Sequence, residues 1–270
     1  MVLSINIKYE RKYLLVAYSI AIAGKGGTGK TTVAALSVLH FCKKNNGPVL
    51  AIDADPDANL GTILGIEVNK TIGELREDVL REIKNFPPGM DKANYVEAGL
   101  HQIIEESRGF DLLTMGRGEG SGCYCYLNSL VRKFSEDLFP SYNWIVMDNE
   151  AGLEHISRRT TNNIDALLIV VNDNPISLNT AKTIKKIASE LKSKIKKEYV
   201  ITNMVRDERK QEVRERIEDL DIEYIGDIPF DKTLGDAVFQ GKPVITLNES
   251  IAKKSIKKIL DKIGGKNGNT

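Results

Sequence analysis

The residues with the most distinctive chemistry form a glycine-rich loop near the start of the chain. The segment from Gly24 to Thr32 has the sequence Gly-Lys-Gly-Gly-Thr-Gly-Lys-Thr-Thr and matches Gly-x-x-x-x-Gly-Lys-Thr. It follows an apolar run, Leu14 to Ala23, that predicts a strand, and it precedes an apolar helical segment, Val33–Leu39. Glycines there let consecutive N–H groups turn toward phosphate oxygens at the positive end of a helix. The sequence therefore predicts a phosphate-binding loop between a strand and a helix.

Individual residues of this loop have predicted roles at a nucleotide. Lys30 is placed to reach the β- and γ-phosphates, and the Thr31 hydroxyl is placed to ligate Mg²⁺. Lys25 is a second lysine that phosphate binding by the loop does not require. The remaining loop residues expected to contact the nucleotide are Gly26, Gly27, Thr28, Gly29 and Thr32.

Two further apolar segments end in carboxylates. In the segment Val49–Asp57, Asp53 and Asp55 project to the same side of extended backbone, because side chains alternate with a period of two. A second apolar run ends in Asp148, as a Walker B strand does. Mg²⁺ retains several waters, so Asp148 is expected to act through a bound water and Asp53 to lie near the magnesium shell.

The pattern Lys-Gly-Gly-x-Gly-Lys-Thr resembles the deviant Walker A ATPases, which include MinD, ParA and the nitrogenase iron protein. The resemblance implies a nucleotide-dependent homodimer in which Lys25 reaches the phosphates of the other subunit. It also implies that Asp55 orients the attacking water. The expected catalytic residues are then Lys25, Lys30 and Asp55, which together with Mg²⁺ neutralise charge and aim water for phosphoryl transfer.

The same resemblance indicates where the base binds. An asparagine in the position of Asn203 hydrogen-bonds adenine in that family, and the segment Ile228–Asp231, including Pro229 and Asp231, lines the base pocket. The GTPase pattern Asn-Lys-x-Asp is absent after the predicted strand Tyr199–Thr202. We therefore expect ATP rather than GTP.

A cysteine pair, Cys123 and Cys125, forms a second candidate site. In extended backbone, residues two apart project to one side, so both sulfurs could approach one soft cation. Two thiolates are too few for a closed site, but a twofold dimer would bring two pairs together as a Cys₄ shell. The nearby His155 is expected to be satisfied by local hydrogen bonds, and Cys42 to lie in the core.

The segments around the cysteines, Gly116–Tyr126 and Asp148–His155, together with the loop, resemble the CooC-type accessory ATPases that help insert nickel into carbon monoxide dehydrogenase. The resemblance implies an ATP-hydrolysing metallochaperone that binds Ni²⁺ or Zn²⁺ at the cysteine pair and has apo carbon monoxide dehydrogenase as its client. Two insertions, residues 1–12 and Ser121-Gly122, depart from that pattern.

The length, composition and apolar patterns of the chain predict one α/β domain. Its 270 residues are 41% hydrophobic, with 38 basic and 37 acidic side chains, which gives no electrostatic case for a nucleic-acid partner. No apolar run approaches the ~20 residues of a membrane helix, so we expect a cytoplasmic protein without stable membrane association. Short apolar runs alternate with helical patterns, which predicts a mostly parallel, doubly wound sheet flanked by helices. The predicted strands are Pro48–Asp53, Phe110–Met115, Trp144–Asp148, Ala166–Val171, Tyr199–Thr202 and Ile222–Ile225.

We expect an N-terminal extension at 1–12, the P-loop ATPase domain at 13–264 and a flexible tail at 265–270. Residues 65–108 lack strand character and predict a mainly helical insertion. The segments Thr180–Lys192 and Glu208–Asp219 predict helices.

Two other functions remain open from the sequence. A lysine-rich helix at 180–197 and the amphipathic segment Ser250–Ile263 could touch DNA or anionic lipid, as in a MinD- or ParA-like spatial organiser. An interfacial iron–sulfur cluster would instead indicate an electron-transfer ATPase, although the ligands of the nitrogenase iron protein are far apart in sequence.

Overall fold

The fold is built on one eight-stranded sheet. The computed structural model describes residues 17–43, 47–82, 92–117, 125–150, 163–191 and 194–264. The strand order is β3-β4-β2-β5-β1-β6-β7-β8, and every neighbouring pair is parallel except β3 with β4. The strands are β1 (Tyr18–Gly24), β2 (Val49–Asp53), β3 (Ile104–Glu106), β4 (Phe110–Thr114), β5 (Trp144–Asp148), β6 (Asn163–Val171), β7 (Lys194–Asn203) and β8 (Glu223–Ile228).

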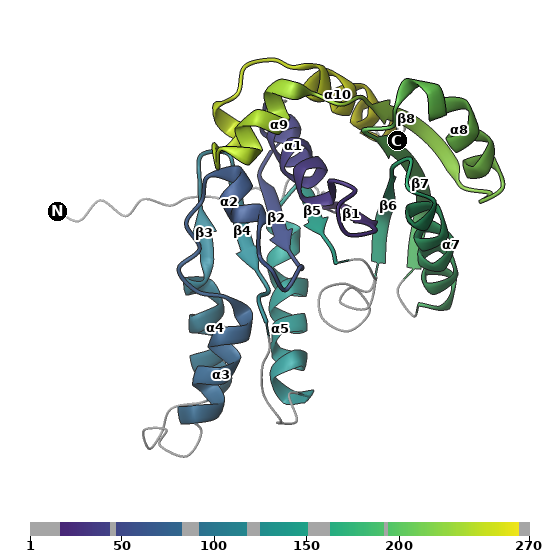
Figure 1. The fold of residues 1–270 in the computed structure, drawn as a ribbon. Helices are drawn as coiled ribbons and strands as arrows, with labels where there is room; N and C mark the ends of the chain where they lie inside the picture. The colour runs from purple at the N-terminus through teal and green to yellow at the C-terminus, as the bar shows by residue number, and fades with distance from the viewer. Residues whose placement is uncertain are drawn as a thin grey trace.

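Helices cover both faces of this sheet (Figure 1). One face packs against α1 (Lys30–Lys43), α2 (Leu60–Leu64), α9 (Lys232–Phe239) and α10 (Ile251–Gly264). The other packs against α3 (Ile72–Glu82), α4 (Lys92–Gln102), α5 (Cys125–Leu138), α7 (Pro175–Glu190) and α8 (Lys210–Glu218). Short 3₁₀ helices lie at Phe139–Ser141, Asp207–Arg209 and Val244–Thr246.

The alternation of strand side chains explains the two hydrophobic cores. In β1, Ile20 and Ile22 face the core beneath α1, whereas Ala21 and Ala23 face the opposite core. Both sets are fully buried, which is why the central strands are continuous apolar runs in the sequence. The predicted doubly wound α/β class is confirmed.

The structure corrects two expectations about elements. Residues 65–108 are mainly helical where they are described, through α3 and α4, but they also contain the strand β3, which pairs antiparallel with β4 at the sheet edge. The lysine-rich helix expected at 180–197 ends at Glu190, and β7 begins at Lys194. Tertiary pairing decides this, because Ile195 lies beside Ile164 of β6 and the Lys196 ammonium is 2.6 Å from the Asp165 carboxylate.

The C-terminal amphipathic segment forms α10, and its apolar side is buried. Ala252, Ile256, Ile259, Leu260 and Ile263 are each at most 2% exposed. They pack in the core that α1 and β8 share. Within the described residues, no helix is both long and apolar enough to cross a membrane.

Candidate nucleotide-binding site

Three adjacent strands place the predicted nucleotide residues at one edge of the sheet. β5 lies between β1 and β2, with Asp148 opposite Ile22 of β1 on one side and Asp53 of β2 on the other. β1 ends at Gly24, where the glycine-rich loop begins. Residues from distant parts of the sequence therefore meet at the carboxyl ends of parallel strands, the usual place for a ligand in such a sheet.

The glycine-rich loop has a backbone that only glycine adopts readily. Gly24, Gly27 and Gly29 have φ values of 152°, 81° and 87°. A Cβ atom on Gly24 would lie 2.4 Å from the Val170 carbonyl oxygen of β6, so a side chain cannot fit there. The loop is closed by Thr28, whose Oγ1 donates to the Lys25 carbonyl at 2.8 Å. This geometry is what a phosphate cradle requires.

The loop lysines differ in their surroundings. Lys30, the first residue of α1, is 7% exposed. Lys25 is half-buried, and its ammonium makes no hydrogen bond or ion pair with any residue that the structure describes. A role of Lys25 across a dimer interface stays a prediction.

Asp148 is buried without the bonds that a buried carboxylate normally has. It is 1% exposed, and neither oxygen makes a hydrogen bond of ordinary geometry with a described residue. Burial raises its pKa to about 7; the nearby Thr31 hydroxyl and Lys30 ammonium oppose this rise, whereas the charges of Asp53 and Asp55 add to it. Unsatisfied buried oxygens beside a hydroxyl suit a hydrated Mg²⁺, which Asp148 and Thr31 would hold.

Asp53 has a different environment from Asp148, although the two lie side by side. Its Oδ2 accepts from the Leu60 N–H at 2.8 Å and its Oδ1 from the Asp55 N–H at 3.2 Å. Burial raises the pKa of Asp53 to about 6, and these backbone hydrogen bonds oppose the rise. Asp53 therefore holds the loop between β2 and α2, and its place in the magnesium shell stays a prediction.

The same loop presents Asp55 to solvent. Asp55 is half-buried, and its Oδ1 accepts from the Asp57 N–H at 3.0 Å. The charge of Asp55 adds to the rise in the pKa of Asp148. A role of Asp55 in orienting the attacking water stays a prediction.

A cavity of about 160 Å³ adjoins the start of α1. Its walls come from α1, from the segment after β7, from the β8–α9 connection and from α9, and they include Thr32, Asn203 and Pro229. The lining is mainly apolar, which suits the flat face of a base. A cavity therefore lies beside the loop where the base pocket is expected, and the binding of adenine there stays a prediction.

Two predicted base-pocket residues make structural bonds at this cavity. Asn203 is 6% exposed, and its Nδ2 donates to the Thr28 carbonyl at 2.7 Å, which ties the loop to the end of β7. Asp231 caps α9 by accepting from the Leu234 N–H at 3.1 Å, and its other oxygen accepts from the Ala252 N–H at 3.0 Å. Both residues thus shape the cavity.

Sequence reasoning missed several lining residues. Met204, which has φ 56°, borders the cavity together with Leu234 of α9 and Ala252 of α10. Phe230 lies within the segment Ile228–Asp231 that was expected to line the base pocket; it is 65% exposed and also borders the cavity. The helix residues have an ordinary amphipathic pattern, so their place at a site follows from packing alone.

The cysteine pair falls largely outside the described residues. Cys123 and His155 lie outside them, and Cys125 is the first residue of α5, with an undescribed side chain. No cluster of three or more metal-ligating side chains occurs within the described residues. Cys42 is partly buried rather than in the core; its Sγ donates to the Gly109 carbonyl at 3.2 Å, and burial raises its pKa to about 11.

Sequence reasoning also missed two contacts between the loop from β2 to α2, which contains Asp55 and Asp57, and the residues that follow β4. The Met115 N–H donates to the Asp53 carbonyl at 2.8 Å, and the Arg117 guanidinium lies 2.6 Å from the Asp57 carboxylate. Met115 and Arg117, near the end of the described range 92–117, therefore contact the residues on either side of Asp55.

Comparisons with known proteins agree with this geometry. The model of the CobQ/CobB/MinD/ParA nucleotide binding domain matches residues 19–244. An uncharacterized ATP-binding protein of Methanocaldococcus jannaschii is 41% identical over 248 residues, which are 90% of this chain and 97% of that protein. The carbon monoxide dehydrogenase accessory protein CooC of Rhodospirillum rubrum is 27% identical over 275 residues, 92% of this chain and 98% of CooC.

Solved structures show the same fold at lower identity. The MinD cell division protein of Aquifex aeolicus superposes with a TM-score of 0.67 and 24% identity, covering 92% of this chain and 97% of that one. The expected P-loop ATPase is confirmed by the match over most of the chain. The chain belongs to the CobQ/CobB/MinD/ParA family of nucleotide-binding ATPases.

Proposed function

We propose that this protein is an ATP-hydrolysing, nucleotide-dependent dimeric metallochaperone. It binds Ni²⁺ or Zn²⁺ through Cys123 and Cys125 of both subunits and delivers nickel to apo carbon monoxide dehydrogenase. The similarity to CooC along nearly the whole of both chains supports the client. The observation that supports the mechanism is the contact of Met115 and Arg117 with Asp53 and Asp57, which lie on either side of Asp55.

The proposed mechanism begins at the nucleotide. Thr31 and Asp148, the latter through a bound water, would hold a Mg²⁺ that supplies positive charge at the phosphates. Lys30 and Lys25 from the second copy neutralise the phosphate oxygens, and Asp55 orients the attacking water. Loss of the γ-phosphate removes the charge that these groups surround. The loop containing Asp55 then rearranges, as switch loops do when that phosphate leaves.

The rearrangement reaches the cysteines through two contacts. Asp57 follows Asp55 in the loop and pairs with Arg117, while the Asp53 carbonyl accepts from the Met115 N–H. We propose that movement of the loop is transmitted through Met115 and Arg117 toward Cys123. Figure 1 shows the first turn of α5, which Cys125 begins, at the end of that helix farther from the sheet.

Metal analysis combined with solution mass tests this function. The purified protein is loaded with Ni²⁺ or Zn²⁺ in the presence of a non-hydrolysable ATP analogue, and metal content and mass are measured together. We expect one metal ion per dimer, and we expect the double variant Cys123→Ala/Cys125→Ala to lose it. Cys42→Ala is the matched control, because that thiol is hydrogen-bonded and its raised pKa disfavours the thiolate that binds metal.

Two results would overturn the proposal. One is a monomer in the presence of the ATP analogue; the other is full Ni²⁺ and Zn²⁺ binding by the double cysteine variant. A further variant, Arg117→Ala, should retain ATP hydrolysis but release metal no faster after hydrolysis than before it. Unchanged coupling in Arg117→Ala would refute the route through Asp57.

A MinD- or ParA-like spatial organiser is the second candidate, and its fold is the observation in its favour. The segment Ser250–Ile263 was expected to contact DNA or lipid in such an organiser. It forms α10, and the apolar side of α10 packs in the core. Co-sedimentation with DNA or with anionic phospholipid vesicles at physiological ionic strength distinguishes the two. Salt-sensitive, ATP-dependent pelleting without bound metal would favour the organiser.

A further inference from the structure

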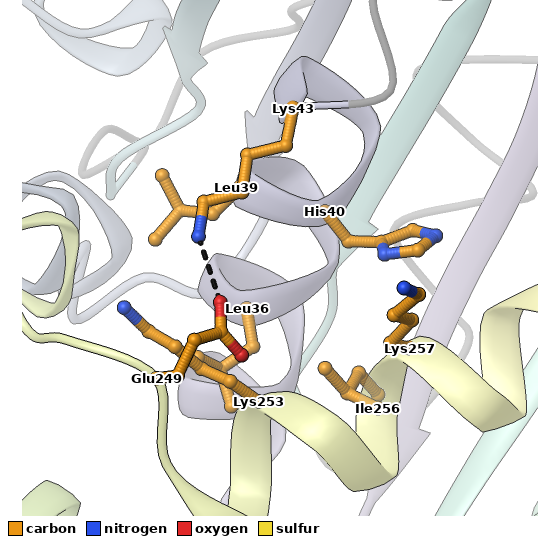
Figure 2. Close-up of a pocket in the computed structure, with 8 residues that line it drawn as sticks. All are labelled: Leu36, Leu39, His40, Lys43, Glu249, Lys253, Ile256 and Lys257. Carbon is orange, nitrogen blue, oxygen red and sulfur yellow. Dashed lines mark hydrogen bonds and ion pairs between the residues drawn. The ribbon is translucent and has the colours of Figure 1, made fainter.

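A second cavity, of about 280 Å³, lies between α1 and α10. Figure 2 shows its lining residues, which come from the second half of α1 and from α10 with the residues just before it. Leu36, Leu39 and Ile256 form its apolar wall. Its volume is close to the lower end of the range for small-molecule pockets. A short hydrocarbon would replace water against this wall.

The rim of the cavity is strongly basic. Lys43, Lys253 and Lys257 line it, with Glu249 as the single carboxylate among the lining residues. The Lys43 ammonium is 3.2 Å from Glu249, and both side chains are more than 60% exposed. Exposed pairs of this kind are weak, so Glu249 offsets only part of the positive charge.

The other two lysines differ in how available their ammonium groups are. Lys253 is partly buried, and burial followed by the charge of Lys43 lowers its pKa; its Nζ donates to the Leu247 carbonyl. Lys257 makes no hydrogen bond or ion pair with a described residue. In Figure 2 its side chain points toward the His40 ring. Three ammonium groups around an apolar wall are complementary to an anion with an apolar body.

A carboxylate that does not line the cavity, that of Asp261, faces His40. The Nε2 of His40 lies 3.7 Å from the Asp261 carboxylate, and the imidazole is 8% exposed. His40 also stacks edge-on against Phe41, with ring centroids 5.3 Å apart. These contacts hold the imidazole as part of the wall, so the anion's partners are the lysines.

The cavity between α1 and α10 shares part of its lining with the expected adenine cavity. Leu36 lines both of them. On α10 the neighbouring residues Ala252 and Lys253 line the base cavity and the basic cavity respectively, and the Ala252 N–H bonds Asp231, which caps α9. A ligand that shifts α10 against α1 therefore changes the walls of the base cavity.

We propose that the cavity between α1 and α10 binds a small organic anion, a carboxylate or phosphate monoester on a short hydrocarbon, and that its occupancy alters nucleotide affinity. This effector site is independent of the metal proposal, because it uses neither Cys123 nor Cys125. Failure of one proposal leaves the other intact.

Calorimetry on the full chain tests the ligand class. The protein is saturated with Mg-ADP to fill the phosphate loop and titrated with acetate, butyrate, hexanoate, butyl phosphate and hexanol. Affinity should rise about fourfold for each methylene that becomes buried. Hexanol should bind at least about tenfold more weakly than hexanoate, because its neutral hydroxyl replaces the carboxylate in the hydrogen bond with an ammonium group. Tighter binding of butyl phosphate than of butyrate would identify phosphate as the head group.

Matched lysine variants locate the binding. Lys257→Ala should weaken hexanoate binding about tenfold, whereas Lys258→Ala should not, because Lys258 is an exposed neighbour on α10 that does not line the cavity. Thermal melting of both variants verifies that they fold. Equal binding by the two variants, equal affinity for hexanol and hexanoate, or no binding at millimolar concentrations would overturn the site.

Reciprocal titrations measure the coupling between anion binding at this cavity and nucleotide binding. Hexanoate affinity is determined with and without Mg-ADP, and ADP affinity with and without hexanoate. We expect the two ratios to be equal and to differ from one by about fivefold, since coupling free energies are reciprocal. Ratios of one would overturn the effector role.

Discussion

The two candidate ligand sites along α1, the glycine-rich loop and the cavity beside α10, offer different groups for binding. At the first turn of α1 the binding groups belong to the backbone of a glycine-rich loop, and Gly24 and Gly29 have positive φ values there. Near its last turn they are side chains, the ammonium groups of Lys43, Lys253 and Lys257. A backbone site fails when one residue gains a side chain, whereas a side-chain site loses affinity in steps.

The largest expected effect breaks the backbone site. Gly24→Ala should reduce Mg-ADP affinity about 100-fold, because its Cβ would lie 2.4 Å from the Val170 carbonyl and its φ is 152°. Isothermal titration with Mg-ADP measures this. Gly241→Ala is the control, since Gly241 also has positive φ but a Cβ there meets nothing within 4 Å. It should lose some stability and retain ADP affinity. Equal ADP affinity in both variants would contradict the cradle geometry.

The next effect concerns the buried carboxylate beside the loop. The folded-state pKa of Asp148, about 7, lies above its ordinary value of about 4. The Mg²⁺-free protein should therefore lose stability as the pH rises from about 4 through 7. Asp148→Asn should raise the free energy of unfolding at pH 8 by about 2 kcal/mol and leave it nearly unchanged at pH 4.

Chemical denaturation at the two pH values, without Mg²⁺, checks this prediction. The exposed Asp137 of α5 supplies the control variant, Asp137→Asn, which should change stability little at either pH. A variant at position 148 that is less stable than the wild type at pH 8 would show that the carboxylate has a favourable partner. Mg²⁺-dependent ATP hydrolysis by Asp148→Asn should fall in either case.

A smaller effect tests how the loop is held. Asn203→Ala removes the 2.7 Å hydrogen bond to the Thr28 carbonyl and leaves that buried oxygen unpaired. Mg-ADP affinity should fall about tenfold. Asn179→Ala, at an exposed position of α7, should leave affinity unchanged. If both variants bind alike, the loop holds its shape without β7.

The smallest effect belongs to the side-chain site. Glu249→Gln should change the free energy of unfolding by less than about 0.5 kcal/mol, because its ion pair with Lys43 is exposed. Hexanoate affinity should nevertheless rise a few fold as the only lining carboxylate is removed. Denaturant titration and calorimetry on one preparation separate the two quantities. A fall in hexanoate affinity would show that Glu249 is part of the site rather than an opposing charge.

Much of the fold could be predicted because its central strands are buried on both faces. Trp144–Asp148 was predicted with the bounds of β5, and the run ending at Asp53 extends one residue before β2. The errors lie where burial is incomplete. β3 is a short edge strand whose only apolar residue is Ile104, and the first residues of β7 are mostly lysines.

Less of the site could be predicted, for a related reason. The loop from Gly24 to Thr32 and the strand-end residues Asp53 and Asp148 have local signatures. Nothing local distinguishes Asp53, bonded to the Leu60 and Asp55 amides, from Asp148, whose oxygens make no hydrogen bond of ordinary geometry with a described residue. That difference depends on which backbone groups the next loop brings to each carboxylate.

The sequence by itself determined the chemistry of the nucleotide loop, because a phosphate cradle needs glycines and lysines at fixed neighbouring positions. It also determined the family, through the same motif. Only the tertiary structure decided that α10 packs on α1 and encloses a basic cavity between residues far apart in the chain. Long-range packing sets such surfaces, and an amphipathic helix has the same sequence pattern whether its neighbour leaves a cavity or fills it.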